Sequence, residues 1–221
     1  MSEPSPQTGS REQNLPDELA LADWRRQTAE LYREVRGCGD AAQAHSVWRA
    51  GRDRLFSGHS QSPLAPLDPL RCSGLPYWSY DPRFRFTVPL VREAEPAAYE
   101  LPTAVGEITR IRQLGWVELP QPIDGRLAVW WLEQYAGGIF LPFRDATAGS
   151  SSYGAGRYLL DTAKGADLGL DGGLLVLDFN FSYHPSCRYD PAWQCPLAPP
   201  QNVLAAAIEA GEQLKSAALR V

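Results

Sequence analysis

The residues best suited to chemistry lie together in the last fifth of the sequence. His184, Cys187 and Cys195 are spaced as H-x2-C-x7-C. Histidine and thiolates are zinc ligands, and a cysteine next to a histidine base can act as a nucleophile. The spacing therefore raises two hypotheses: a zinc site at these three residues, or a hydrolase or transferase centre in which His184 activates Cys187.

Neither hypothesis is complete on the sequence. A structural zinc site normally has four ligands, and Asp178, Asp190 or a distant residue would have to supply the fourth. Asp178 is also the one visible partner that could orient His184 beside Cys187. We therefore predict no metal site and leave open whether the protein is an enzyme. A Cys187–Cys195 disulfide fits the spacing, but the cytoplasmic setting that we expect disfavours it.

A polar face is predicted along residues 174–184. In a strand, alternate side chains share a face, so Asp178, Asn180 and His184 would lie on one side and a wholly apolar set on the other. A buried carboxylate needs a partner, and Arg144 and Arg157 are the obvious candidates for Asp178. Two interpretations stay open: a buried network that joins three strands, or a pocket whose arginines hold an anionic ligand.

A glycine- and serine-rich loop over residues 149–156 precedes Arg157. Its glycines allow close backbone approach and its serines offer hydrogen-bond donors, so it could cradle a phosphate or carboxylate. It is not a P-loop, since the lysine and the following helix are missing, and a tight strand-to-strand loop is the alternative. The ligand-binding set that we predict is Arg144, Tyr153, Arg157, Asp178 and Asn180, and no cofactor is predicted.

Two helices and then several short strands must position these residues. Apolar side chains at three- and four-residue spacing predict a helix over 17–37 and a second over 40–56. After residue 62 prolines punctuate short apolar segments, and strands are predicted at 84–90, 104–111, 114–119, 127–133, 139–143, 157–160 and 174–183. A last strand at 203–208 and a short helix from Gly211 are also expected. The fold class is mainly β (α+β), an antiparallel barrel-like or sandwich domain with two N-terminal helices packed against it.

The domain organisation follows from the same pattern. Residues 1–15 are polar and are expected to be a disordered lead-in, residues 16–60 a helical segment on the main domain, and residues 61–221 a β-rich domain. The two helices could also mediate a homodimer through Trp24 and Trp48.

Composition excludes two classes of partner. The chain carries 26 acidic and 21 basic residues, a net charge of −5, and has no basic stripe, so a nucleic-acid partner is not expected. Its apolar runs are too short for a membrane span, and its first residues lack the apolar core of a signal peptide. We expect a soluble, cytoplasmic protein whose partner is a small anionic molecule.

Several stretches are similar to one protein family. Residues 52–86, 140–161, 176–204 and 207–212 resemble the bacterial and archaeal domain-of-unknown-function family 1684, the most specific segments being FLPFRDATAGSSSYGAGRYLLD, VLDFNFSYHPSCRYDPAWQC and AIEAGE. The resemblance covers most of residues 24–215. Ser152 stands where the family usually has threonine, and His184 where it usually has asparagine. The resemblance implies the domain but no activity.

Overall fold

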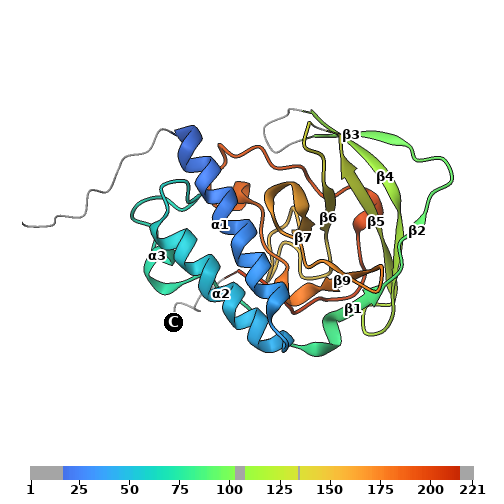
Figure 1. The fold of residues 1–221 in the computed structure, drawn as a ribbon, viewed down its shortest axis with the longest axis horizontal. Helices are drawn as coiled ribbons and strands as arrows, with labels where there is room; N and C mark the ends of the chain where they lie inside the picture. Colours follow the sequence, from blue (N-terminus) through green and yellow to red (C-terminus); the bar gives the residue numbers. More distant parts are fainter. Residues whose placement is uncertain (1–16, 103–107, 134, 215–221) are drawn as a thin grey trace, which may run out of the picture.

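The computed structural model describes residues 17–102, 108–133 and 135–214, in which two long helices precede an antiparallel β region (Figure 1). Helix α1 spans Asp17–Gly37 and α2 spans Ala41–Gly58, which confirms the predicted pair. Asp40 caps α2, since its carboxylate accepts a hydrogen bond from the backbone N–H of Gln43 at 2.7 Å. A four-residue helix, α3 (Leu70–Ser73), follows and was not predicted.

The strands form two antiparallel sheets. One sheet has the order β1-β9-β8; the other has the order β2-β4-β5-β6-β7, with β3 paired to β4. The strands are β1 (Arg85–Val88), β2 (Val91–Arg92), β3 (Ala98–Pro102), β4 (Ile108–Leu119), β5 (Gly125–Leu132), β6 (Ile139–Phe143), β7 (Arg157–Asp161), β8 (Leu170–Asp171) and β9 (Leu174–Asp178). The antiparallel, mainly β prediction is confirmed, but the sheets do not close into a barrel.

Three predicted strands differ from the structure in an informative way. The segments expected at 104–111 and 114–119 belong, within the described residues, to the single strand β4, whose burial alternates along its length. The strand expected at 174–183 ends at Asp178. The Asp178 carboxylate accepts a hydrogen bond from the backbone N–H of Asn180 at 3.1 Å and caps a 3₁₀ turn over Phe179–Phe181, which stops the extended chain.

The C-terminal segment is irregular rather than a strand. A 3₁₀ turn covers Pro200–Asn202, and Val203 makes one isolated bridge with Arg144, so the strand expected at 203–208 is not formed. The helix expected from Gly211 lies largely outside the described residues, since 215–221 are not described.

Strand β5 is buried on both faces and divides the apolar interior in two. Leu127 and Val129 belong to the larger core, which also contains Trp48 of α2 and Leu177 of β9. The alternate residues, Ala128 and Trp130, face a second, smaller core that includes Cys187 and Cys195. The separation follows directly from the two-residue period of a strand.

The helices form a layer over one side of the sheets. In Figure 1, α1 and α2 lie beside β7 and β9, away from β2 and β4. Trp48 is completely buried, and its indole N–H donates to the hydroxyl of Tyr32 on α1 at 3.1 Å. In the described part of the chain, neither long helix nor any other is apolar enough to cross a membrane.

Candidate functional site

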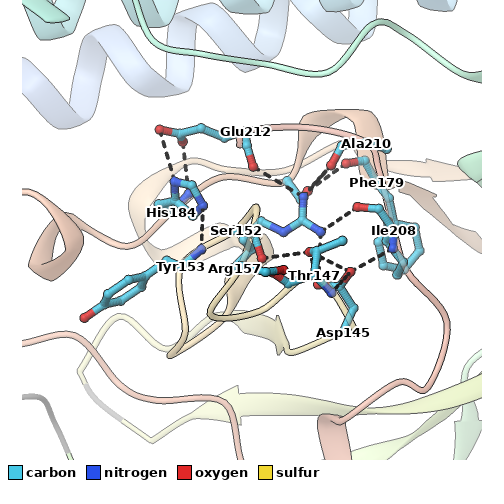
Figure 2. A network of polar contacts seen from close by, with 12 residues as sticks. Asp145, Thr147, Ser152, Tyr153, Arg157, Phe179, His184, Ile208, Ala210 and Glu212 are labelled. Atoms are coloured by element: carbon cyan, nitrogen blue, oxygen red, sulfur yellow. Dashed lines mark hydrogen bonds and ion pairs between the residues drawn. The ribbon is translucent and has the colours of Figure 1, made fainter. Parts of the chain in front are cut away.

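Arg157 lies at the centre of a buried polar network (Figure 2). One guanidinium nitrogen, Nη2, lies 3.1 Å from Oδ1 of Asp145 and donates to the carbonyl of Ile208 at 2.8 Å. The other, Nη1, donates to the carbonyl of Ala210. Asp145 Oδ2 in turn accepts the backbone N–H of Ile208 at 2.7 Å. The network fastens the irregular C-terminal segment to β7.

Asp145 draws the glycine- and serine-rich loop into the same network. Its carboxylate accepts the Thr147 hydroxyl at 2.8 Å, and the hydroxyls of Thr147 and Ser152 lie 2.8 Å apart. All three residues are buried. Ser152 of the loop therefore directs its hydroxyl inward to a protein partner, and the exposed Ser150 donates to the carbonyl of Thr147, as in a tight structural turn.

Glu212 is a second centre, completely buried between a helix and the sheet region. Its Oε2 lies 2.9 Å from Nη2 of Arg52 on α2 and accepts the backbone N–H of His184 at 3.0 Å. Burial alone would raise the pKa of Glu212, but Arg52 and His184 outweigh it and hold that pKa below its ordinary value. Glu212 is thus an ionised group that links α2 to the C-terminal segment.

Asp178 belongs to a separate cluster, which corrects the pairing predicted from the sequence. It accepts the side-chain amide of Asn180 at 2.8 Å, and Nη1 of Arg85 lies 3.4 Å from it. Neither Arg144 nor Arg157 is its partner: Arg157 pairs with Asp145. Burial raises the pKa of Asp178, against the hydrogen bonds from Asn180 and the charge of Arg85.

The five predicted ligand-binding residues do not share one open site. Arg157, Asp178 and Asn180 are completely buried and hydrogen-bonded to protein atoms. Arg144 and Tyr153 are half-buried. Tyr153 extends away from the Arg157 network in Figure 2. The first interpretation of the polar residues, a network that joins segments of the fold, describes this geometry.

His184 is engaged on both ring nitrogens. Nε2 accepts the backbone N–H of Tyr153 at 3.1 Å, so the proton of the neutral ring resides on Nδ1, which lies 3.5 Å from Oε1 of Glu212. The ring is 2% exposed. This geometry positions a loop and does not offer His184 to Cys187 as a base.

The two cysteines of the motif contact each other instead. The backbone N–H of Cys187 donates to Sγ of Cys195 at 3.4 Å, and both thiols are free and buried. Across the described ranges, no three His, Cys, Asp or Glu side chains are grouped as a metal ion would require.

A cavity of about 70 Å³ lies between the helix layer and the sheet region, next to these networks. Aromatic side chains of α1 and α2 and of the 183–195 segment line it together with several polar groups. Its lining includes Trp24, Tyr32, Arg52, Phe56, Tyr158, Asp161, Lys164, Tyr183, His184 and Cys195. This volume is enough for several water molecules or a small organic molecule.

Asp161, at the end of β7, is the unsatisfied group in this cavity. It is 2% exposed, and its Oδ1 is buried without a hydrogen-bond partner. Its other oxygen lies 3.8 Å from Nζ of Lys164. Burial raises the pKa of Asp161, and the nearby charge of Lys164 only partly opposes that effect. A buried carboxylate oxygen of this kind costs free energy unless a donor meets it.

Three residues that line the cavity were not predicted from the sequence: Arg52, Asp161 and Lys164. Arg52 carried a signal: it falls four residues after Trp48 and three before Leu55, so a charged residue occupies the apolar face of its helix. Asp161 closes a wholly apolar strand segment, YLLD, where a buried carboxylate could have been suspected. No sequence pattern pointed to Lys164, apart from its being one of only two lysines in the chain.

The comparisons with known proteins agree with this architecture. Residues 71–213 match the model of a family described as "Protein of unknown function (DUF1684)". No curated protein matches the chain significantly. The solution NMR structure of an uncharacterized protein of Haloarcula marismortui is similar with a TM-score of 0.55 and 34% identity, over 75% of this chain and 90% of that one. Since the matched segment spans well over half of the sequence, the chain belongs to the DUF1684 family.

Proposed function

We propose that the protein binds a small organic anion in the cavity between the α1–α2 layer and the end of β7. The observation that carries the proposal is the buried, unpartnered Oδ1 of Asp161, which lines this cavity together with Arg52 and Lys164. The predicted type of ligand, small and anionic, is kept. The binding residues proposed here are different from those predicted, because Arg157 and Asp178 do not line this cavity and are hydrogen-bonded to other protein groups.

The charges in the cavity favour an anion. Arg52 and Lys164 are cationic, and Asp161 is the one carboxyl group among the lining residues. Because the pKa of Asp161 is raised, this carboxyl group is less readily ionised and repels a negative ligand less. Arg52 already forms an ion pair with Glu212 at 2.9 Å. Lys164 is exposed and lies 3.8 Å from Asp161, so its positive charge is more available to a ligand.

The neutral part of the ligand is defined by its other contacts. Asp161 Oδ1 needs a donor, which a ligand hydroxyl or amino group would supply. The aromatic rings of Trp24, Phe56 and Tyr183 offer flat apolar surface for a short carbon skeleton. A small hydroxy acid or amino acid satisfies both requirements at once.

Binding can be measured by saturation-transfer NMR and calorimetry with paired probes. Each pair contains a small carboxylic acid with a hydroxyl or amino group and the same acid without it. We expect the hydroxy or amino member of a pair to bind at least about tenfold more tightly, since it alone reaches Asp161. Asp161→Ala should abolish that difference, and Lys164→Ala should weaken both members by about twofold to fivefold.

Asp171→Asn is the matched control, because Asp171 is an exposed aspartate on β8 that does not line this cavity. It should leave every affinity unchanged. Binding that is equal in the wild type and in Asp161→Ala for all probes would disprove the assignment of this cavity, as would a complete lack of binding by both probe classes.

A further inference from the structure

Cys187 and Cys195 form a thiol pair that the proposed ligand site does not use. Cys187 lies in the 3₁₀ turn Ser186–Arg188, and Cys195 ends the following loop. The backbone N–H of Cys187 donates to Cys195 Sγ at 3.4 Å, and both side chains lie in the smaller apolar core. Cys187 and Cys195, eight residues apart in sequence, are therefore neighbours in the structure, and both thiols are free.

The two thiols are not equivalent. The hydrogen bond from the Cys187 thiol, the backbone N–H of Cys187 and the charge of Lys164 lower the pKa of Cys195, against the effect of burial. The same thiol contact and burial raise the pKa of Cys187. Cys195 is therefore the more readily ionised thiol of the pair, and Cys187 the one that more readily keeps its proton.

Access is also unequal. Cys195 lines the cavity between the helix layer and β7, whereas Cys187 does not. Cys187 instead lies near the hydroxyl of Tyr153, within the smaller core. A small reagent that enters the cavity meets Cys195 first.

We propose that Cys187 and Cys195 are a peroxide-reactive dithiol, in which Cys195 is the attacking residue and Cys187 the resolving one. The Cys195 thiolate attacks one oxygen of a hydroperoxide, the O–O bond breaks, and hydroxide or alkoxide leaves, giving a sulfenic acid on Cys195. The Cys187 sulfur then attacks the Cys195 sulfur. An S–S bond forms, the S–O bond breaks, and the departing hydroxide takes the Cys187 proton as water.

In total, two thiols are oxidised to one disulfide and one hydroperoxide is reduced to water and an alcohol, or to two waters for hydrogen peroxide. The disulfide closes the loop between residues 187 and 195. Reduction by a dithiol would restore the starting state.

The experiment uses hydrogen peroxide in molar equivalence to the protein, with intact-mass and peptide mass spectrometry after alkylation. We expect a mass loss of about 2 Da, with the disulfide located between Cys187 and Cys195. Cys72 is exposed and serves as an internal control thiol. Cys195 should react at least about tenfold faster than Cys72 at neutral pH.

Two single variants separate the roles. In Cys187→Ser the sulfenic acid on Cys195 cannot be resolved within the pair, so a dimedone adduct should accumulate there. In Cys195→Ser, Cys187 should stay reduced. The idea is overturned if Cys195 reacts no faster than Cys72, if Cys187 is oxidised equally well in Cys195→Ser, or if wild-type Cys195 accumulates sulfenic or sulfinic acid without the disulfide.

Discussion

At the scale of single residues, the protein contains two kinds of buried charge. Arg157 is completely buried, and its two terminal nitrogens meet a carboxylate and two backbone carbonyls. These contacts oppose the effect of burial, which still lowers the pKa of Arg157, and its Nε has no hydrogen-bond partner. Asp161 is almost as deeply buried, but one of its oxygens meets no protein donor. Asp161 differs from Arg157 in that it lines the cavity, where the proposed ligand can supply the missing donor.

Replacement of Asp161 by asparagine should stabilise the unliganded protein. The folded-state pKa of Asp161 is raised, so its ionised form lowers the free energy of unfolding as pH rises through that pKa. Asp161→Asn removes the charge at nearly constant shape, and we expect a gain of about 1 kcal/mol at pH 7. The gain should disappear below the unfolded-state value of 3.8, where the wild-type carboxyl is neutral in both states.

Urea denaturation of wild type and variant at several pH values tests this expectation. A variant that is less stable than the wild type at pH 7 would mean that Asp161 serves the fold and not a ligand.

At the scale of elements, the C-terminal segment is held by close backbone contact. Gly211 has φ of +79°, and a Cβ atom there would lie 2.3 Å from Oγ and 2.5 Å from the carbonyl oxygen of Ser182. An alanine must therefore displace the segment that supplies the carbonyl of Ala210 to Arg157 and the carboxylate of Glu212 to Arg52. We expect Gly211→Ala to lower the free energy of unfolding by at least about 2 kcal/mol, measured by thermal or urea denaturation.

Gly172→Ala is the matched control for that substitution. Gly172 also has a positive φ, +55°, but no atom lies within 4 Å of the Cβ position. Gly172→Ala should lower the free energy of unfolding by only about 1 kcal/mol, the cost of placing a Cβ atom on a residue with positive φ. Equal losses in the two variants would show that the close approach at Gly211 contributes nothing.

Helix α2 also carries a buried histidine whose protonation should affect stability. His45 is buried against Trp48 and Phe181, and burial lowers its pKa to about 4 from an ordinary 6.5. Because the unfolded chain binds a proton more readily, stability should fall as pH drops from 6.5 toward 4, by about 2 kcal/mol at pH 5. In His45→Gln this loss should be absent between pH 7 and pH 5, a window above the range in which Asp23 and Glu212 are protonated. Parallel pH profiles for the two proteins would contradict this prediction.

The elements were predictable where the signal is local. The spacing of Leu31 and Val35 and of Trp48 and Leu55 was sufficient for α1 and α2, and β6 was predicted at its observed bounds. The end of β9 was missed because one hydrogen bond, from the Asn180 N–H to Asp178, outweighs the alternating pattern that continues beyond it. The pairing of Arg157 with Asp145 depends on which loop folds back over β7, and local periodicity contains no information on that.

At the scale of the whole molecule, the helix layer and the sheets are one unit. They share the larger apolar core, and the cavity exists only where α1 and α2 meet the end of β7 and the 183–195 segment. The family match begins at residue 71, after both helices. The cavity therefore combines side chains from the matched domain with side chains that precede it, which is why no single stretch of sequence pointed to it.

The Arg52–Glu212 ion pair is the clearest test of this coupling, because it joins α2 to the C-terminal segment across 160 residues of sequence. Arg52→Met keeps the packing against Trp48 and Tyr183 but leaves Glu212 buried without its arginine, with Nδ1 of His184 3.5 Å from its Oε1. We expect a loss of about 3–5 kcal/mol in the free energy of unfolding at pH 7. In the wild type the pKa of Glu212 is lowered, so the stabilisation that its ionised form gives to the folded protein is lost as pH falls below 4.5. In the variant, burial without Arg52 should raise the pKa of Glu212. The stability of the variant should therefore recover as pH falls toward 4.5. Glu212→Gln in the Arg52→Met background removes the unpaired charge and should restore at least half of the loss in urea denaturation. If the double variant is no more stable than Arg52→Met, the helix layer is held by packing alone and the ion pair does not couple it to the sheets.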